Sequence, residues 1–168
     1  ASAAFCEVCE QGHYANEAKT ECVKCEVGHE CSAGRKKKCE AGLLSAEGSA
    51  YCEACEAGTY PDPDSSSCEP CAPGTISAAG DPECSPCGTG TYQNGTDCKA
   101  CVAGRYGAGE GLHTKLCSGI CPAGKHSFRY ATQCTPCDVG KHSSAAESET
   151  CAPCPMHRTS SPGATVCG

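Results

Sequence analysis

The sequence contains no tryptophan and very few large apolar side chains. Val, Ile, Leu, Met and Phe together supply only 15 of its 168 residues. Chains in which such residues fall below about one fifth rarely fold by apolar burial alone. A conventional hydrophobic core is therefore excluded. No apolar stretch approaches the roughly 20 residues that a membrane-spanning helix needs, so we expect no membrane span in this segment.

Positive charge is also scarce. The net charge is −7 at pH 7, which argues against nucleic acid as a partner because phosphates require a basic surface. We interpret the one basic run, residues 35–38, as a solvated loop rather than as a heparin or protease site. Because the sequence begins without Met, we expect it to be a segment of a longer polypeptide.

Cysteine is the residue that the sequence has in excess. The chain contains 21 cysteines among its 168 residues, and small folds with few apolar residues are commonly held by disulfides. Because disulfides persist in oxidising surroundings, we expect an extracellular or cell-surface protein that passes through the secretory pathway. The sequon NGT at positions 94–96 agrees with export and predicts N-glycosylation of Asn94.

Cysteine pairs with the spacing C-x-x-C recur about every 16 residues, and a fixed period of this kind is typical of tandem repeats. The pairs begin at Cys6, Cys22, Cys52, Cys68, Cys84, Cys98, Cys134 and Cys151. A C-x-x-x-C variant begins at Cys117, and one irregular repeat contains Cys31 and Cys39. The pattern predicts one continuous array over residues 1–168. The expected repeats are approximately 6–21, 22–38 (irregular), 39–51, 52–67, 68–83, 84–97, 98–116, 117–133, 134–150 and 151–168.

A glycine stands three residues after the second cysteine of nearly every pair, and His157 takes this place in the last repeat. A glycine at a fixed place indicates a turn with positive φ or a close approach of two backbones. Tyr, Ile or His often follows two residues later, on the same side of an extended strand. We expect this side chain to pack on a disulfide.

These features predict the fold class. We expect a small disulfide-rich protein, an elongated tandem array of disulfide-laddered loops and short β-ribbons with almost no helix. Helix is disfavoured because Gly, Pro and Ser interrupt the sequence every few residues.

The spacing leaves two disulfide schemes open. In the ladder scheme, which we favour, the second cysteine of each pair bonds to the first cysteine of the next pair, and Cys6 is unpaired or reaches a preceding repeat. In the interleaved scheme, Cys52–Cys68 would form together with Cys55–Cys71. Sequence alone does not fix connectivity. The ladder pairs are Cys9–Cys22, Cys25–Cys31, Cys39–Cys52, Cys55–Cys68, Cys71–Cys84, Cys87–Cys98, Cys101–Cys117, Cys121–Cys134, Cys137–Cys151 and Cys154–Cys167.

The sequence gives little support for a catalytic or metal-binding site. Successive C-x-x-C pairs could form Cys₄ zinc sites, and a multi-zinc protein is the minor alternative. His126 and His142 stand where Tyr stands in other repeats, so we interpret them as rings packed on disulfides. The acidic residues of the motif PDPD at 61–64 are too few for a calcium site. The sequence therefore predicts no enzymatic activity, no catalytic residue, no cofactor and no metal.

The stretch CEACEAGTYPDPDSSSCEPCAPGT, with its C-x-x-C-x-x-G-T-Y motif, resembles the ephrin-receptor-like (GCC2/GCC3) cysteine-rich repeat. It is also similar to the first loop module of tumour-necrosis-factor-receptor cysteine-rich domains. The resemblance covers nearly the whole chain and implies an extended, disulfide-laddered extracellular segment. It also implies closure of each loop from one cysteine to the next, which supports the ladder. The departures are the Cys31 and Cys39 repeat, the Cys117–x–x–x–Cys121 spacing, and His157 in place of Gly.

The sequence therefore favours an extracellular structural or scaffold protein, a repeat segment of a filament, surface appendage, stalk or matrix. Its expected partners are other protein chains, through self-association or a filament or matrix partner, and possible glycans. The alternative is a receptor ectodomain that binds a ligand, or a cell-surface antigen.

Peptide mapping by mass spectrometry without reduction distinguishes the two disulfide schemes. The ladder predicts a cross-linked peptide containing Cys55 and Cys68, whereas the interleaved scheme predicts Cys52 with Cys68. The same map reports glycan occupancy at Asn94 and the fate of Cys6. Finding Cys55 bonded to Cys71 would rule out the ladder.

Overall fold

The structure is a computed structural model that describes residues 8–168. Within that range it contains nine two-stranded antiparallel sheets and no helix, so the chain has a small disulfide-rich fold of strands and loops. The chain divides into two compact units. The first unit runs to Cys71 and includes Ser77–Cys84, and the second consists of Ala72–Ile76 and Ser85–Gly168.

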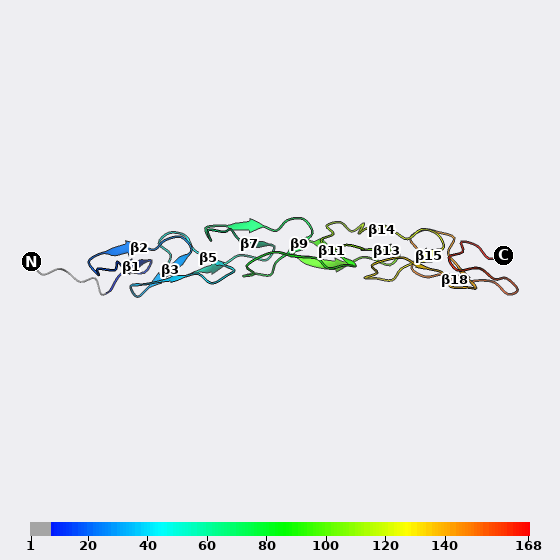
Figure 1. The fold of residues 1–168 in the computed structure, drawn as a ribbon, viewed down its shortest axis with the longest axis horizontal. Coiled ribbons are helices and arrows are strands. Elements are labelled where there is room, and N and C mark those ends of the chain that lie inside the picture. Colours follow the sequence, from blue (N-terminus) through cyan, green and yellow to red (C-terminus); the bar gives the residue numbers. More distant parts are fainter. Residues whose placement is uncertain (1–7) are drawn as a thin grey trace, which may run out of the picture. The chain divides into compact units, whose positions relative to one another are not determined.

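Each sheet is a hairpin of two consecutive strands (Figure 1). In the first unit the pairs are β1 (His13–Ala15) with β2 (Cys22–Lys24), β3 (His29–Ser32) with β4 (Arg35–Lys38), β5 (Leu43–Leu44) with β6 (Glu53–Ala54), and β7 (Thr59–Pro61) with β8 (Cys68–Pro70). In the second unit they are β9 (Thr75–Ile76) with β10 (Ser85–Pro86), β11 (Thr91–Asn94) with β12 (Asp97–Ala100), β13 (Arg105–Tyr106) with β14 (Gly119–Ile120), β15 (Lys125–His126) with β16 (Thr135–Pro136), and β17 (Lys141–His142) with β18 (Ala152–Pro153).

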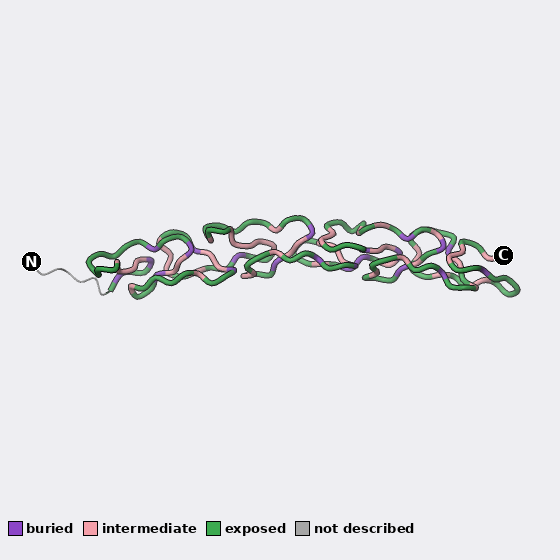
Figure 2. The backbone as a smooth tube through the Cα atoms, in the orientation of Figure 1, coloured by how far each residue is buried: buried purple, intermediate pink, exposed green. Residues whose placement is uncertain are grey.

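Disulfides occupy the place of an apolar core. Buried residues form short isolated stretches along the chain rather than one cluster (Figure 2). The most deeply buried side chains are almost all cysteines, such as Cys25, Cys55 and Cys101. Twelve large apolar side chains are exposed, which shows that apolar burial contributes little to this fold.

The ten disulfides of the structure join the same ten pairs as the ladder scheme, with Cα–Cα distances between 5.5 and 6.1 Å. The first cysteine of a bond and its partner are separated by 13 residues in six of the ten. Each bond therefore closes one repeat. Cys6 lies outside the described residues, so the prediction that it is unpaired or bonds to a preceding repeat stays open.

The recurring glycine has positive φ in all nine repeats that carry it, as the sequence predicted. His157, its replacement in the last repeat, has a φ of 69° and so adopts the same backbone conformation. The carbonyl of this glycine also makes a hydrogen bond at the end of the hairpin. It accepts from the backbone N–H of the second cysteine of the next pair. One example is Cys71 N–H to Gly58 C=O at 2.9 Å.

The interpretation of residues 35–38 as a solvated loop is wrong in one respect, because they form strand β4. Ala33 and Gly34, both with positive φ, make the tight turn that lets β4 pair with β3. The strand is exposed, as expected. Its Lys36 ammonium lies 3.1 Å from the Glu26 carboxylate, and this hydrogen bond lowers the pKa of Glu26 and raises that of Lys36.

Gly42→Ala tests whether the glycine positions carry a close approach as well as positive φ. A Cβ at Gly42, where φ is +89°, would overlap the carbonyl oxygen of Gly80. We expect this variant to lower the free energy of unfolding by more than the roughly 1–3 kcal/mol of positive-φ strain alone.

Two control variants separate the causes in thermal unfolding of the oxidised protein. Gly95→Ala carries the φ strain (φ +68°) but meets no atom within 4 Å, and Gly88→Ala carries neither penalty. We expect the order Gly42→Ala, Gly95→Ala, Gly88→Ala from least to most stable. Equal stability of the first two would show that the close approach to Gly80 costs nothing.

Candidate functional site

Successive repeats are linked by a recurring set of backbone hydrogen bonds, which we call a joint. In one joint the Gly104 N–H donates to the Ser127 carbonyl at 2.9 Å. The Ser127 hydroxyl donates back to the Arg105 carbonyl at 2.8 Å. The Tyr130 N–H donates to the Cys101 carbonyl at 3.2 Å. A joint therefore connects the cysteine–glycine turn of one repeat to a serine and a turn residue of the next.

The third bond of the joint occurs six times in residues 8–168, at N–O distances between 2.7 and 3.2 Å. In every case the donor residue has positive φ. The donors, followed by the cysteines whose carbonyls accept, are Gly48 and Cys25, Gly80 and Cys55, Gly111 and Cys87, Tyr130 and Cys101, Glu147 and Cys121, and Gly163 and Cys137. Except at Cys25, each of these cysteines opens a repeat whose disulfide closes over 11 to 16 residues.

The joint also brings a repeat against the one two steps further along. A Cβ on Gly74, Gly104 or Gly124 would overlap the carbonyl oxygen of the turn residue two repeats later. For Gly124 that oxygen belongs to Gly163. Glycine at these positions is therefore required by contact between repeats and not only by the turn in which it lies.

The serine of the joint is the feature that the sequence prediction missed. It stands three residues after the recurring glycine, or after His157, and its side chain is buried. The fixed offset of this serine is visible in the sequence, but the polar residues around it favour a surface loop and hide its role. The buried serines are Ser45, Ser77, Ser127, Ser143 and Ser160. Four of them donate to the residue that follows the recurring glycine of the preceding repeat, and the acceptors are the carbonyls of His29, Thr59, Arg105 and Lys141.

One glutamine performs both roles of the serine in a repeat that lacks it. The Gln93 side-chain oxygen accepts from Gly74 N–H at 2.6 Å, and its side-chain nitrogen donates to the Thr75 carbonyl at 2.8 Å. Gln93 lies in β11, which continues as a four-residue strand where other repeats turn. Gln93 stands three residues after Gly90, at the serine position of the repeat, but only the structure shows that its side chain makes the two hydrogen bonds of the serine.

The two histidines predicted to pack on disulfides do so. His126 Nδ1 lies 3.3 Å from Cys151 Sγ, and His142 Nδ1 lies 3.2 Å from Cys167 Sγ. Each ring lies on the disulfide of the following repeat and not on that of its own loop. The two histidines thus strengthen the connection between neighbouring repeats.

These histidines also create the only two metal-like clusters found among the described residues, namely His126 with Cys137 and Cys151, and His142 with Cys154 and Cys167. In both clusters the two sulfur atoms are bonded to each other. Zinc binds cysteine as thiolate, so the oxidised chain offers one imidazole at each cluster. The Cys₄ zinc sites of the minor alternative are also incompatible with the ten disulfides.

Asp62, considered above for calcium, instead closes its own loop. Its carboxylate accepts from the backbone N–H of Ser66 at 2.7 Å and from the Ser66 hydroxyl at 2.6 Å. These hydrogen bonds hold the pKa of Asp62 below its usual value.

Asn94, the predicted glycosylation site, is exposed at the end of β11 beside Gly95. Attachment of a glycan to Asn94 stays a prediction.

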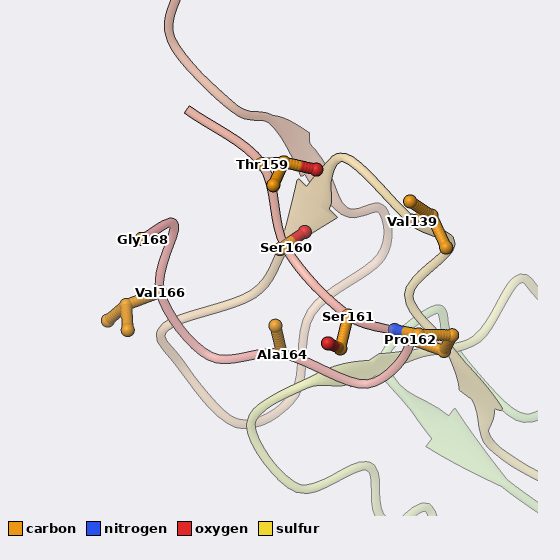
Figure 3. A pocket seen from close by; sticks show the side chains of 8 residues that line it. All are labelled: Val139, Thr159, Ser160, Ser161, Pro162, Ala164, Val166 and Gly168. Carbon is orange, nitrogen blue, oxygen red and sulfur yellow. The ribbon is translucent and has the colours of Figure 1, made fainter. Parts of the chain in front are cut away.

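A groove lies at the last joint of the second unit (Figure 3). It encloses about 600 Å³ and is open to solvent. Val139 and Val166, at 66% and 68% exposure, lie on its rim, while Ser160 lies on its floor. The lining residues are Val139, Thr159, Ser160, Ser161, Pro162, Ala164, Val166 and Gly168.

No protein-family model matches the chain, and a search of curated proteins found no match either. The resemblance to ephrin-receptor-like repeats therefore rests on the sequence motif alone. In residues 8–168, no helix is long and apolar enough to cross a membrane.

Ser127→Ala tests the buried serine of a joint. The change leaves the Arg105 carbonyl without its donor, and an unsatisfied buried acceptor costs about 1–3 kcal/mol. We expect a lower unfolding temperature of the oxidised protein and faster hydrogen exchange at the Gly104 amide. Ser144→Ala, at an exposed position in the next repeat, is the matched control. Identical exchange at Gly104 in both variants would mean that the hydroxyl does not support the joint.

Proposed function

We propose that this chain is a repeat segment of an extracellular structural or scaffold protein, one that forms part of a filament, surface appendage, stalk or matrix. The observation that carries the proposal is the joint, whose hydrogen-bond pattern recurs along the chain. Arrays whose repeats contact mainly their neighbours can be lengthened without enlarging a core. Such a construction suits a protein whose role is to span or connect.

The disulfides support an extracellular setting. Ten disulfides in one chain are typical of an oxidising compartment. Closing a loop of about 13 residues contributes roughly 3 kcal/mol in the chain-entropy model, and no repeat has more than three large apolar side chains (Val, Ile, Leu, Met or Phe) to add. Reduction would therefore remove the main source of stability, and such a chain is suited to surroundings where reduction is rare.

We also propose that the protein has no catalytic activity. Most ion pairs of the described residues lie at the surface, as for Lys37 with Glu40 and Lys141 with Asp138. Catalysis requires a nucleophile or base held against an orienting group at a pocket. His126 and His142 are packed on disulfide sulfurs, which supports a packing role for them.

A second candidate function is recognition of a protein ligand by a receptor ectodomain or surface antigen. Phe128 and Tyr130 favour it, because they are 59% and 62% exposed within one turn. Exposed aromatic side chains are common at protein interfaces. The motif resemblance to receptor repeats points in the same direction. This candidate predicts a soluble or membrane-bound partner of different sequence.

Localisation and assembly together test the scaffold proposal. We expect an antibody against the chain to label polymeric material outside unpermeabilised cells in immunogold electron microscopy. We also expect iodoacetamide to label none of the 20 paired cysteines unless the native material is first reduced. Labelling only after permeabilisation would contradict the proposal. Label on single receptor molecules in the plasma membrane would favour the second candidate.

A further inference from the structure

We propose that strand β4, residues 35–38, is a processing site for a serine endoprotease whose acidic specificity pocket directs cleavage after Lys or Arg. The sequence alone gave no reason to prefer a protease site here over a solvated loop. Three structural features give one: the disulfide pattern around β4, its open edge and the ion pairs of its side chains. The inference goes beyond the proposed function, because it holds for a scaffold and for a receptor ectodomain alike.

Residues 32–38 are the longest stretch of the described chain that no disulfide loop encloses. The stretch follows the disulfide Cys25–Cys31 and precedes the next, which Cys39 opens. Between all other successive disulfides only two or three residues lie outside a loop. A cut inside a loop leaves its pieces joined by the disulfide. A cut in residues 32–38 leaves no disulfide between the repeats on its two sides.

The same stretch carries the densest positive charge of the chain. Four of the 13 Lys and Arg residues follow one another at positions 35–38. Among residues 8–168, Lys24 and Lys99 are the only other basic residues between disulfide loops, and each lies alone in a linker of two residues. Only at β4, therefore, do several basic residues coincide with a stretch long enough to enter the cleft of a protease.

Strand β4 has an open edge. It pairs only with β3, in a two-stranded sheet, and all four of its residues are exposed. In the part of the chain that the structure describes, the backbone of residues 35–38 makes no hydrogen bond to any element except β3. The nearest bond from another strand ends one residue earlier, at the Gly34 carbonyl, which accepts from Ala15 N–H at 3.2 Å. An extended segment of this kind can pair with a protein cleft as an added strand does.

The side chains of β4 offer cations that an acidic pocket can take. Arg35 forms no ion pair with any described residue. Lys36 and Lys37 lie 3.1–3.5 Å from glutamate oxygens, and such pairs near solvent are weak. Arg35 also follows the turn at Ala33 and Gly34 directly, and exposed turns are preferred sites of proteolytic cleavage.

The hydrolysed bond is one of the three within residues 35–38. The next bond, between Lys38 and Cys39, is protected because its N–H donates to the Gly28 carbonyl at 2.9 Å and Cys39 is held in a disulfide. Cleavage consumes one water molecule. Its oxygen bonds to the carbonyl carbon, which becomes a carboxylate at the end of the first piece, and the released amine at the start of the second piece takes up a proton.

After hydrolysis, a joint holds the two pieces without a covalent bond. In this joint the Gly28 N–H donates to the Ser45 carbonyl at 3.1 Å, and the Gly48 N–H donates to the Cys25 carbonyl at 2.8 Å. A denaturant breaks such hydrogen bonds but leaves disulfides intact. Cleavage at β4 therefore converts a covalent connection between repeats into one that can come apart.

Limited digestion of the oxidised 168-residue chain with trypsin tests the site. We expect the first cut after Arg35, Lys36 or Lys37, and two pieces that separate on a denaturing gel without reductant. Iodoacetamide in the stopping solution prevents disulfide exchange. Lys24 and Lys99 are internal controls, because both are exposed. We expect cleavage after them to be about tenfold slower, since proteolysis follows the population of the locally opened chain and each linker is held by disulfides on both sides.

Two variants separate the site from its surroundings. The first replaces the basic run with glutamine, as Arg35→Gln, Lys36→Gln, Lys37→Gln and Lys38→Gln. We expect it to remain one species on the gel without reductant over the same digestion time, although cuts inside closed loops appear after reduction. The matched control, Lys24→Gln with Lys99→Gln, should separate as fast as the unchanged chain. An unchanged disulfide map shows that both variants fold.

Native material shows whether the site is used. Labelling of free amines in protein isolated with protease inhibitors, followed by mass spectrometry, should identify chains that begin at residue 36, 37 or 38. The proposal is overturned if every chain in the native material continues through residues 35–38. It is also overturned if trypsin cleaves after Lys24, after Lys99 or inside a closed loop before it cleaves β4. Neither result changes the immunogold test of the scaffold function.

Discussion

The disulfide that closes each repeat is the constraint on which the rest of the structure depends. A loop of some 13 residues with two or three strand residues on each side would be marginal in water by itself. Once Cys55 and Cys68 are joined, the glycine turn and the hairpin have little remaining freedom. The turn can then present its amide and carbonyl groups in fixed directions, which a joint requires.

The joints use mainly backbone groups, and this explains how repeats with such different loop sequences can follow one another. Only the cysteines, the glycine and the small buried serine are restricted, because each either closes the loop or allows two backbones to approach. Gly107 takes the serine position in one joint, where its carbonyl still accepts from Gly90. Gln93 supplies the same two bonds from a side chain. The joint thus preserves its hydrogen bonds rather than its residues.

In a fold of this kind, the groups that stabilise the chain are different from the side chains that form its surface. The most deeply buried side chains are almost all disulfide cysteines, and most large apolar side chains are exposed to solvent. The loop tips can therefore vary in charge and length at little cost to the stability of the fold. The surface ion pairs, such as that of Lys36 on β4 with Glu26, contribute little to the free energy of unfolding because solvent screens them.

The sequence by itself determined the repeat, the positive φ of its glycines, the short hairpins and the packing of His126 on sulfur, because these follow from local spacing. It left two disulfide schemes open, and it gave no sign of the hydrogen bonds of Gln93 or of strand β4 in the basic run. Only the tertiary structure decided how repeats meet, including which disulfide each histidine covers and why Gly42 must lie against Gly80. The physical reason is that these contacts join residues some 20 to 40 positions apart, and their pairing depends on the direction in which one closed loop presents its backbone to the next.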